Sequence, residues 1–156
     1  MKAIYKALAD FQQECPVILK DTPGYGYKYA DLPVIFETIN PLLKKHGLGF
    51  TQLINGNKIK TILFHVESEE SLESETDMPI ESLNYEEITK IKDGAEIKLQ
   101  VIKGFEGMNK AQAIGSLITY FRRYSLSSLL GLITDKDTDG VGSEDTNQTN
   151  KSNSRL

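Results

Sequence analysis

Residue types that support metal binding and covalent cross-links are scarce in this 156-residue sequence. It contains one cysteine, Cys15, two histidines, His46 and His65, and no tryptophan. A single cysteine excludes a disulfide within the chain and any cysteine-rich metal site. The histidines lie beside a predicted helix end and within a predicted strand, without the spacing of a zinc site, so we expect structural roles for both.

Long apolar runs and nucleotide-binding motifs are also missing. No apolar run approaches the ~20 residues that a membrane-spanning helix needs, and the first residues form no apolar leader segment. We therefore expect a protein of the reducing cytoplasm, with no membrane contact. No G-x-x-x-x-G-K-[ST] loop occurs, so hydrolysis of ATP by a P-loop is unsupported, and we expect no cofactor.

Acidic residues outnumber basic ones, but the two are separated along the chain. The net charge is −4, yet residues 67–96 carry −9 while residues 16–66 carry +3 and residues 97–134 carry +4. The acidic residues follow no spacing that indicates a two-metal nuclease, so we interpret their segment as a solvated face or an insertion loop. Because basic segments flank it, the negative net charge does not exclude a polyanionic partner.

Helical periodicity occurs in three places. Residues 2–14 predict a first helix, and a second is expected from an N-cap at Asp31 to a C-cap at Gly47, with a kink at Pro41. Residues 109–131 predict the longest helix. Its apolar face is expected to contain Ile114, Leu117, Ile118, Phe121 and Tyr124.

Strand periodicity fills the middle of the chain. The turn Asn55-Gly56-Asn57 between two β-rich runs predicts a hairpin. The expected strands are residues 48–54, 58–66, 71–78 and 96–103, whereas residues 81–95 have no clear assignment. This order predicts an α+β fold, in which helices pack on a curved antiparallel β-sheet.

The chain is expected to divide into one domain and a tail. Residues 1–134 hold all the periodic segments, and residues 135–156 are acidic and rich in polar residues, as in a disordered tail. The run 135–140 matches the first half of a calcium-binding loop. Thr146 stands where the second half needs a glutamate, so an acidic tail is the better interpretation.

The long helix carries a polar stripe opposite its apolar face. No acidic residue lies between its first lysine and its last arginine, and its side chains are of the kinds that bind phosphate oxygens. The stripe consists of Gln112, Ser116, Thr119 and Arg123, with Arg122 at its flank, and Lys110 at the start of the helix is a further DNA-binding candidate. The stripe is either a nucleic-acid contact or the solvated face of a surface helix. Arg122 has a second candidate role, an ion pair at a subunit contact.

A glycine- and tyrosine-rich loop is the second candidate site. Tyr25, Tyr27 and Lys28 combine aromatic rings with a cation on a flexible backbone. Nucleobases stack on such rings. Burial of the rings against the sheet or a helix is the equally weighted alternative.

Three sequence blocks together resemble the ERF (essential recombination function) family of phage single-strand annealing proteins. Gln112 begins the first block, which continues through residues 113–126 and 129–131 and contains Gly-Ser, Thr-Tyr and Arg-Arg-Tyr. Residues 27–32 and 41–48 resemble the other two blocks, in the family's order. The similarity covers most of residues 24–140.

The resemblance implies a fold, an activity and an assembly. Proteins of this kind pair complementary DNA strands without ATP, share a β-β-β-α core, form homo-oligomeric rings or filaments, and hold DNA in a positively charged groove. The arginine pair and its polar neighbours are the implied groove residues. A phage exonuclease or a host single-strand-binding protein is a candidate partner. Residues 81–108 are longer than the family's usual link and could form an extra hairpin.

Two other functions stay open at this point. One is a metal-dependent nuclease that uses the acidic segment. The other is a non-catalytic protein-interaction module of a recombination complex.

Overall fold

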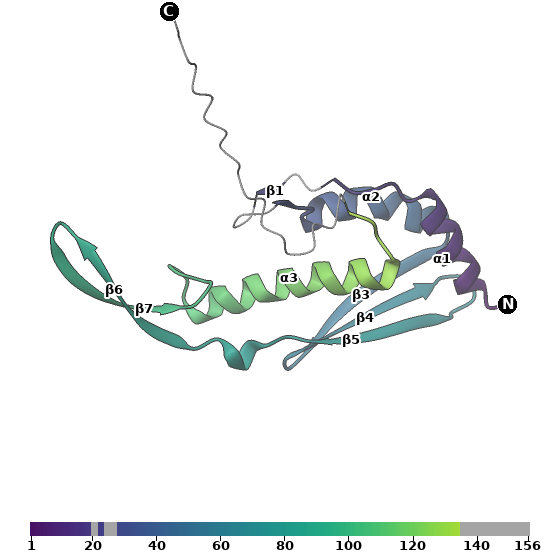
Figure 1. Ribbon diagram of the computed structural model, residues 1–156. Helices are drawn as coiled ribbons and strands as arrows, with labels where there is room; N and C mark the ends of the chain where they lie inside the picture. The colour runs from purple at the N-terminus through teal and green to yellow at the C-terminus, as the bar shows by residue number, and fades with distance from the viewer. Residues whose placement is uncertain (20–21, 24–27, 135–156) are drawn as a thin grey trace, which may run out of the picture.

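The computed structural model describes residues 1–19, 22–23 and 28–134, and the expected tail and calcium-loop run lie outside this part of the chain. The described fold consists of three α-helices, a three-stranded sheet, a two-stranded hairpin and a short pair of two-residue strands (Figure 1). In chain order the elements are α1 (Ala3–Glu14), β1 (Thr22–Pro23), β2 (Lys28–Tyr29), α2 (Leu32–Lys45), β3 (Leu48–Asn55), β4 (Lys58–His65), β5 (Ser71–Asp77), the 3-10 turn η1 (Ile80–Ser82), β6 (Tyr85–Lys92), β7 (Ala95–Ile102) and α3 (Lys110–Leu130).

The central sheet is antiparallel with the order β3-β4-β5. The predicted hairpin is confirmed: Asn55 pairs with Lys58, and Gly56 enters the turn with φ +60°. A positive φ is easily adopted by glycine because it has no Cβ. The predicted third strand is also confirmed, as β5. These strands and the helices that pack on them confirm the expected α+β class.

The expected fourth strand exists but does not join this sheet. β7 pairs with β6, in a separate two-stranded hairpin that turns at Asp93 and Gly94, where φ is +53° and +79°. The unassigned residues 81–95 contain most of η1 and β6. Charged residues interrupt the alternation of β6, which explains why its strand pattern was weak. The insertion at 81–108 is therefore a hairpin followed by a loop.

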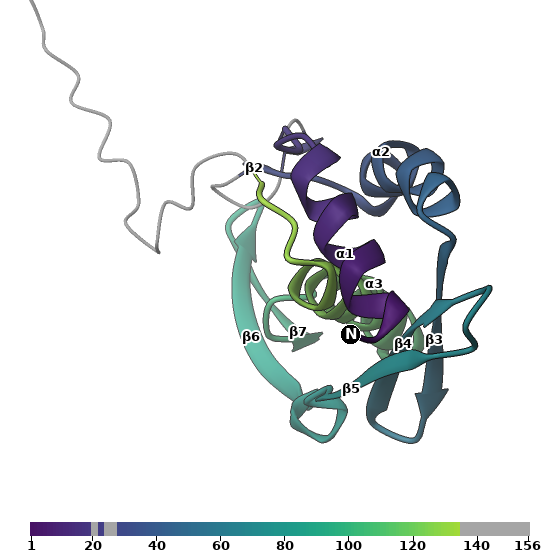
Figure 2. The ribbon, with the colours of Figure 1, turned by 90° about the vertical axis from the view of Figure 1, so that its right-hand side faces the viewer.

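All three helices lie on one face of the β3-β4-β5 sheet (Figures 1 and 2). α3 packs along β4 and β5, α2 packs on β3, and α1 crosses the end of the sheet and contacts α2. The inner face of β4 presents Ile59, Thr61 and Leu63, all fully buried. The described residues thus form a two-layer arrangement in which none of the described elements packs on the outer face of the sheet.

Two apolar clusters line α3 from end to end. The larger joins α1, α2, the sheet and the C-terminal half of α3 through Ile4, Ala7, Phe11, Ile18, Ala30, Ile35, Ile39, Leu43, Leu48, Leu63, Leu126 and Leu130. The smaller joins the N-terminal half of α3 to the far end of the sheet and the base of the β6–β7 hairpin through Ile59, Met78, Leu83, Ile102, Ala113 and Leu117.

Local capping explains where the helices begin. The Asp31 carboxylate accepts a hydrogen bond from the Val34 amide at 3.1 Å, which confirms the predicted N-cap. α2 continues through Pro41 to Lys45, so the kink expected there stays a prediction. None of the helices in the described ranges is long and apolar enough to cross a bilayer.

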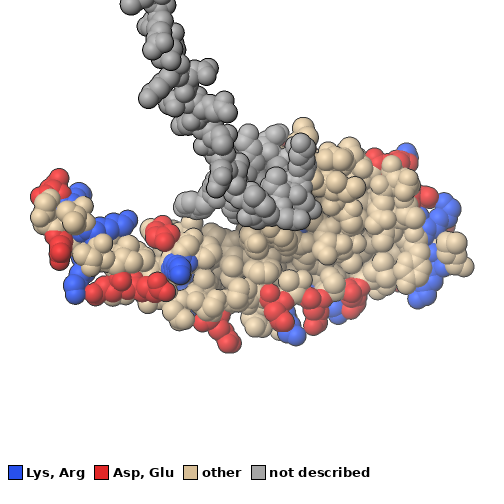
Figure 3. Space-filling view, in the orientation of Figure 1, with Lys and Arg blue, Asp and Glu red and all other residues tan. Residues whose placement is uncertain are grey.

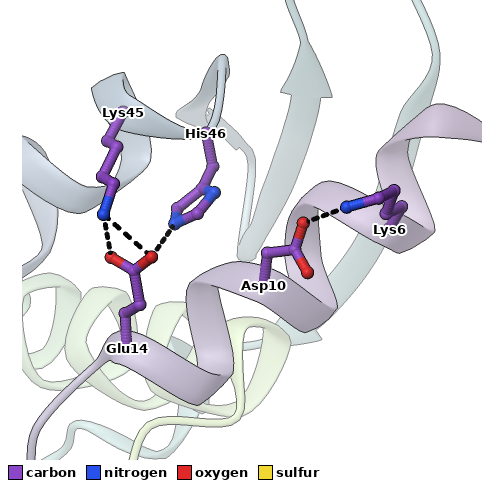
Figure 4. Close-up of polar contacts among 5 residues, drawn as sticks. All are labelled: Lys6, Asp10, Glu14, Lys45 and His46. Atoms are coloured by element: carbon purple, nitrogen blue, oxygen red, sulfur yellow. Dashed lines mark hydrogen bonds and ion pairs between the residues drawn. The ribbon is translucent and has the colours of Figure 1, made fainter.

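Polar contacts connect α1 to the end of α2 (Figure 4). The Glu14 carboxylate accepts hydrogen bonds from Lys45 Nζ at 2.7 and 2.9 Å, and His46 Nε2 lies 3.3 Å from Glu14 Oε1. The hydrogen bond from Lys45 is the main cause that lowers the pKa of Glu14. Within α1, Lys6 and Asp10 form an i,i+4 ion pair. Because Lys6, Asp10, Glu14 and Lys45 are exposed, their ion pairs contribute little beside the apolar clusters.

We expect Leu126→Ala to lower the free energy of unfolding by about 2–5 kcal/mol, since it opens a cavity where α3 meets the larger cluster. Denaturant titration followed by circular dichroism measures the change. Leu19→Ala is the control, because Leu19 is 57% exposed. A similar loss for both variants would contradict the assigned position of α3.

Candidate nucleic-acid interface

The two adjacent arginines of α3 point in different directions, as residues about 100° apart on a helix must. Arg122 turns toward β3 and α2: its Nε donates to Gln52 Oε1 at 3.4 Å, and its guanidinium lies 5.9 Å from the centre of the Phe36 ring. Gln52 also donates from Nε2 to the Arg122 carbonyl at 3.0 Å. Arg122 is therefore held against the inner side of the sheet.

Gln52 belongs to a small buried polar network that the sequence analysis missed. Its Nε2 lies within hydrogen-bond distance of Thr61 Oγ1 at 3.2 Å and Ser125 Oγ at 3.0 Å. The Ser125 hydroxyl donates to the Phe121 carbonyl at 2.7 Å. Thr61 and Ser125 are almost completely buried, so these bonds avoid the cost of leaving their polar atoms unsatisfied. The available signal was a glutamine at an inward-facing position of a strand, between Phe50 and Ile54.

Arg123 lies with two tyrosines on the opposite, outer side of α3. Its guanidinium carbon is 5.3 Å from the ring centre of Tyr120 and 5.6 Å from that of Tyr124. The two rings lie 4.5 Å apart, and Tyr120 and Tyr124 are 38% and 54% exposed. Placing Tyr124 on the apolar face was therefore wrong. In the C-terminal half of α3 the face turned to the core is the one with Leu126 and Leu130, which leaves Tyr124 outside.

Three other residues of the predicted stripe are gathered beside a shallow hollow. Gln112, Ser116 and Thr119 line it with Met108 and Gly115, and its volume is about 420 Å³. Their polar atoms also serve the helix. Gln112 Oε1 accepts from the Asn109 amide at 2.9 Å in a capping box, and Thr119 Oγ1 donates to the Gly115 carbonyl at 3.2 Å. Within the Gln112 side chain, the Nε2 amino group remains as a donor for a ligand.

The other predicted residues fall at the ends of this surface or outside the described residues. Lys110 is exposed in the first turn of α3, and its backbone N–H donates to the Tyr85 hydroxyl at 3.2 Å. Lys28 lies in β2, of which only the backbone is described. Tyr25 and Tyr27 lie outside the described residues, so both interpretations of their rings stay open.

The acidic segment forms the outer side of β5, the η1 turn and part of the β6–β7 hairpin. On β5, Glu73 pairs with Lys60 at 2.6 Å, while Glu75 and Asp77 lie 3.6 and 3.8 Å from Lys58. Figure 3 shows acidic side chains along this lower edge and a broad middle region with little charge of either sign. In the described part of the chain, no three His, Cys, Asp or Glu side chains gather in a way that could hold a metal ion.

Comparison with known proteins assigns the chain to a family. A profile of the ERF superfamily matches residues 4–155. The chain belongs to the ERF superfamily. No curated protein and no solved structure gave a match. The family carries a general role in phage recombination and strand annealing, and its members are generally non-catalytic. Of the Thr-Tyr and Arg-Arg-Tyr block on which the sequence resemblance was based, Tyr120, Arg123 and Tyr124 lie on the outer side of α3, and Arg122 lies on the inner side.

The two arginines should differ in their effect on stability. Arg122→Ala removes the Gln52 contact and the contact with Phe36, so we expect a loss of about 1–2 kcal/mol in the free energy of unfolding. Arg123→Ala, the comparison variant, removes the cation–π contacts with Tyr120 and Tyr124 on the outer side of α3, and we expect a smaller loss, about 0.5–1 kcal/mol. Thermal and urea unfolding of both variants tests this, and a larger loss for Arg123→Ala would show that the inner and outer assignments are reversed.

Proposed function

We propose that this ERF protein binds single-stranded DNA and anneals complementary strands without hydrolysing nucleotide. The observation that carries the proposal is the outer side of α3. There Arg123 lies over two exposed tyrosine rings, and the hollow lined by Gln112, Ser116 and Thr119 lies on the preceding turns of the same helix. Family membership supplies the general activity, and this surface is the candidate for performing it.

The chemistry of the surface suits a phosphate backbone. Guanidinium, amide and hydroxyl groups donate hydrogen bonds to phosphate oxygens. Contact with Tyr120 and Tyr124 restrains the Arg123 side chain at the surface, which lowers the entropy lost when it binds an anion. Because phosphate contacts carry no sequence information, such binding would accept any sequence and leave the base edges available for a complementary strand.

One copy of this surface is too small to hold DNA firmly. Among the described residues of α3, the only cations are Lys110, Arg122 and Arg123, and Arg122 faces the sheet. A ring or filament of chains would place many such surfaces along one strand, and the effective concentration of each would raise the overall affinity. We therefore propose homo-oligomeric assembly as part of the function, in the cytoplasm of a bacterial host.

The two alternative functions have less support. A metal-dependent nuclease needs clustered carboxylates, and the described carboxylates of β5 pair with lysines instead. A pure protein-interaction module would need no arginine-and-tyrosine group on the outer side of α3. An exonuclease or a single-strand-binding protein remains a candidate partner for the annealing reaction.

The function is tested by mixing complementary fluorescent oligonucleotides without nucleotide or metal. We expect the protein to speed their pairing and to bind single strands more tightly than duplex of equal length, at matched salt. Equal affinity for both forms, together with an unchanged pairing rate, would rule out annealing. Loss of DNA only when Mg²⁺ is added would identify the nuclease instead.

Arg123→Ala should weaken binding to single-stranded DNA of every sequence by about tenfold, or ~1.4 kcal/mol. The slope of log affinity against log salt should fall by about 0.7, the value for one phosphate contact on a single strand. Fluorescence anisotropy over a salt series measures both. Lys58→Ala is the control, since it removes one cation from the outer face of the sheet, where Lys58 lies near Glu75 and Asp77. An equal loss of affinity in both variants would show that Arg123 acts only through its positive charge, without a specific contact to DNA.

A further inference from the structure

The β6–β7 hairpin extends away from the rest of the molecule beside the N-terminal end of α3 (Figure 1). Only its base is anchored, through the buried Ile102. Every residue from 89 to 100 is exposed on both faces of the hairpin. We call residues 85–102 the arm.

The register divides the arm into an apolar and a polar face. Ile88 pairs with Leu99, Lys90 with Ile97 and Glu86 with Val101, and these pairs share one face. Lys92 and Ala95 belong to the same face, and the opposite face carries Tyr85, Glu87, Thr89, Ile91, Glu96, Lys98, Gln100 and Ile102. Over the projecting residues 86–101 the first face is therefore the more apolar, with Ile88, Ala95, Ile97, Leu99 and Val101 against Ile91 alone. On the opposite, polar face Glu87 and Lys98 form an ion pair at 3.1 Å.

The apolar face needs a cover that the described chain does not supply. Ile97 and Leu99 are 38% and 39% exposed. A two-stranded hairpin is at best marginally stable in water when neither face is packed. The arm contains three lysines and four acidic residues, so its charge does not favour a polyanion. Its apolar face suits another protein surface.

An unfilled apolar groove lies on the far side of the same chain, between α2 and β3. Its volume is about 610 Å³, and its lining is Phe36, Asn40, Leu43, Lys44, Gly47, Leu48, Gly49, Phe50, Phe64 and Val66. Phe50 belongs to the inner face of the sheet, and Phe64 crosses Gly49 on the outer face, where an added Cβ would lie 2.5 Å from the ring. The groove therefore extends around the edge of β3.

β3 is also the unprotected edge of the sheet. Edge strands usually carry charges or prolines that prevent pairing with another chain. β5, the other edge, carries Glu73, Glu75 and Asp77, whereas β3 contains no charged residue and no proline. Among the described strands, none lies beyond β3 (Figure 2). This edge can therefore accept a strand from a second copy.

We propose that the arm of one copy docks along the β3 edge of a second copy, with its apolar face in the α2–β3 groove. The arm and the groove lie at opposite ends of the molecule, so an arm does not reach its own groove (Figure 1). The contact joins two different surfaces, and it repeats from copy to copy into a ring or a filament. It gives the assembly in the proposed function a specific interface, but it forms without DNA and is tested without it.

The first test changes the two faces of the arm separately. The double variant Ile97→Glu, Leu99→Glu places charge on the apolar face and should convert the wild-type oligomer to a monomer of 17.5 kDa by light scattering. Ile91→Glu is the matched control: Ile91 is 78% exposed on the polar face, and its variant should keep the wild-type mass. A monomeric wild-type protein at micromolar concentration, or equal loss in both variants, would overturn the proposal.

The second test changes the groove. Val66→Glu should also give a monomer, whereas Ile133→Glu, at a residue of similar exposure outside the groove, should not. Mixing the Val66→Glu chain with the arm variant restores one intact arm and one intact groove, so the mixture should form a complex of twice the chain mass. Two monomeric variants that stay monomeric on mixing, or an oligomeric Val66→Glu, would overturn the pairing.

Cross-linking provides a readout that does not depend on assembly-breaking variants. In a Cys15→Ser background, chains with Ile97→Cys and chains with Val66→Cys should form a mixed disulfide, while Ile91→Cys chains should form little. Equal cross-linking from both faces of the arm would overturn the docking orientation. DNA-binding assays on the monomeric variants remain a separate measurement, so failure of this contact is distinguishable from failure of DNA binding.

Discussion

Burial of one side of α3 against β4, β5 and the other two helices determines the rotation of α3 about its axis. The apolar part of that contact runs from Ala113 to Leu130, and the polar part is the hydrogen bonding of Gln52, Thr61 and Ser125. Apolar packing alone permits small rotations, but a buried hydroxyl that needs a partner does not. Together they place Arg122 toward the sheet and Arg123 away from it.

The same rotation explains why the neighbouring residues Arg122 and Arg123 have different roles. Tyr120, Arg123 and Tyr124 lie together on the exposed side, where an anion can reach them, while Arg122 connects α3 to β3 and α2. A neighbouring pair of like charges would repel if both pointed outward from one place. Their separation gives the outer surface one restrained cation and leaves the other to contact Gln52 and Phe36.

The two ends of the molecule differ in how completely their apolar side chains are buried. At the C-terminal end of α3, three helices and the sheet enclose a common cluster. Beyond its N-terminal end, no other described element covers either face of the arm, and within residues 1–19, 22–23 and 28–134 the α2–β3 groove is similarly uncovered. A chain that exposes a matching projection and hollow is suited to contact with its own copies, and an annealing protein benefits because repeated subunits bring their weak DNA contacts onto one strand.

Elements stabilised by their neighbours in the chain were predictable. The Asn55-Gly56-Asn57 turn, the Asp31 cap and the long helical repeat each depend on backbone preferences a few residues apart, so the hairpin, α2 and α3 were correctly expected. β6 was not expected, because charged residues interrupt its alternation, and the Asp93-Gly94 turn that joins it to β7 was a local hairpin signal that the sequence interpretation did not use. The α+β class, the polar stripe on the long helix and the family resemblance were thus determined by the sequence alone. Three features were decided only by tertiary packing: which arginine faces the sheet, the exposure of Tyr124, and the departure of the fourth strand from the sheet to form the arm. Each depends on contacts with residues more than twenty positions away in the chain, or on the lack of such contacts among the described residues.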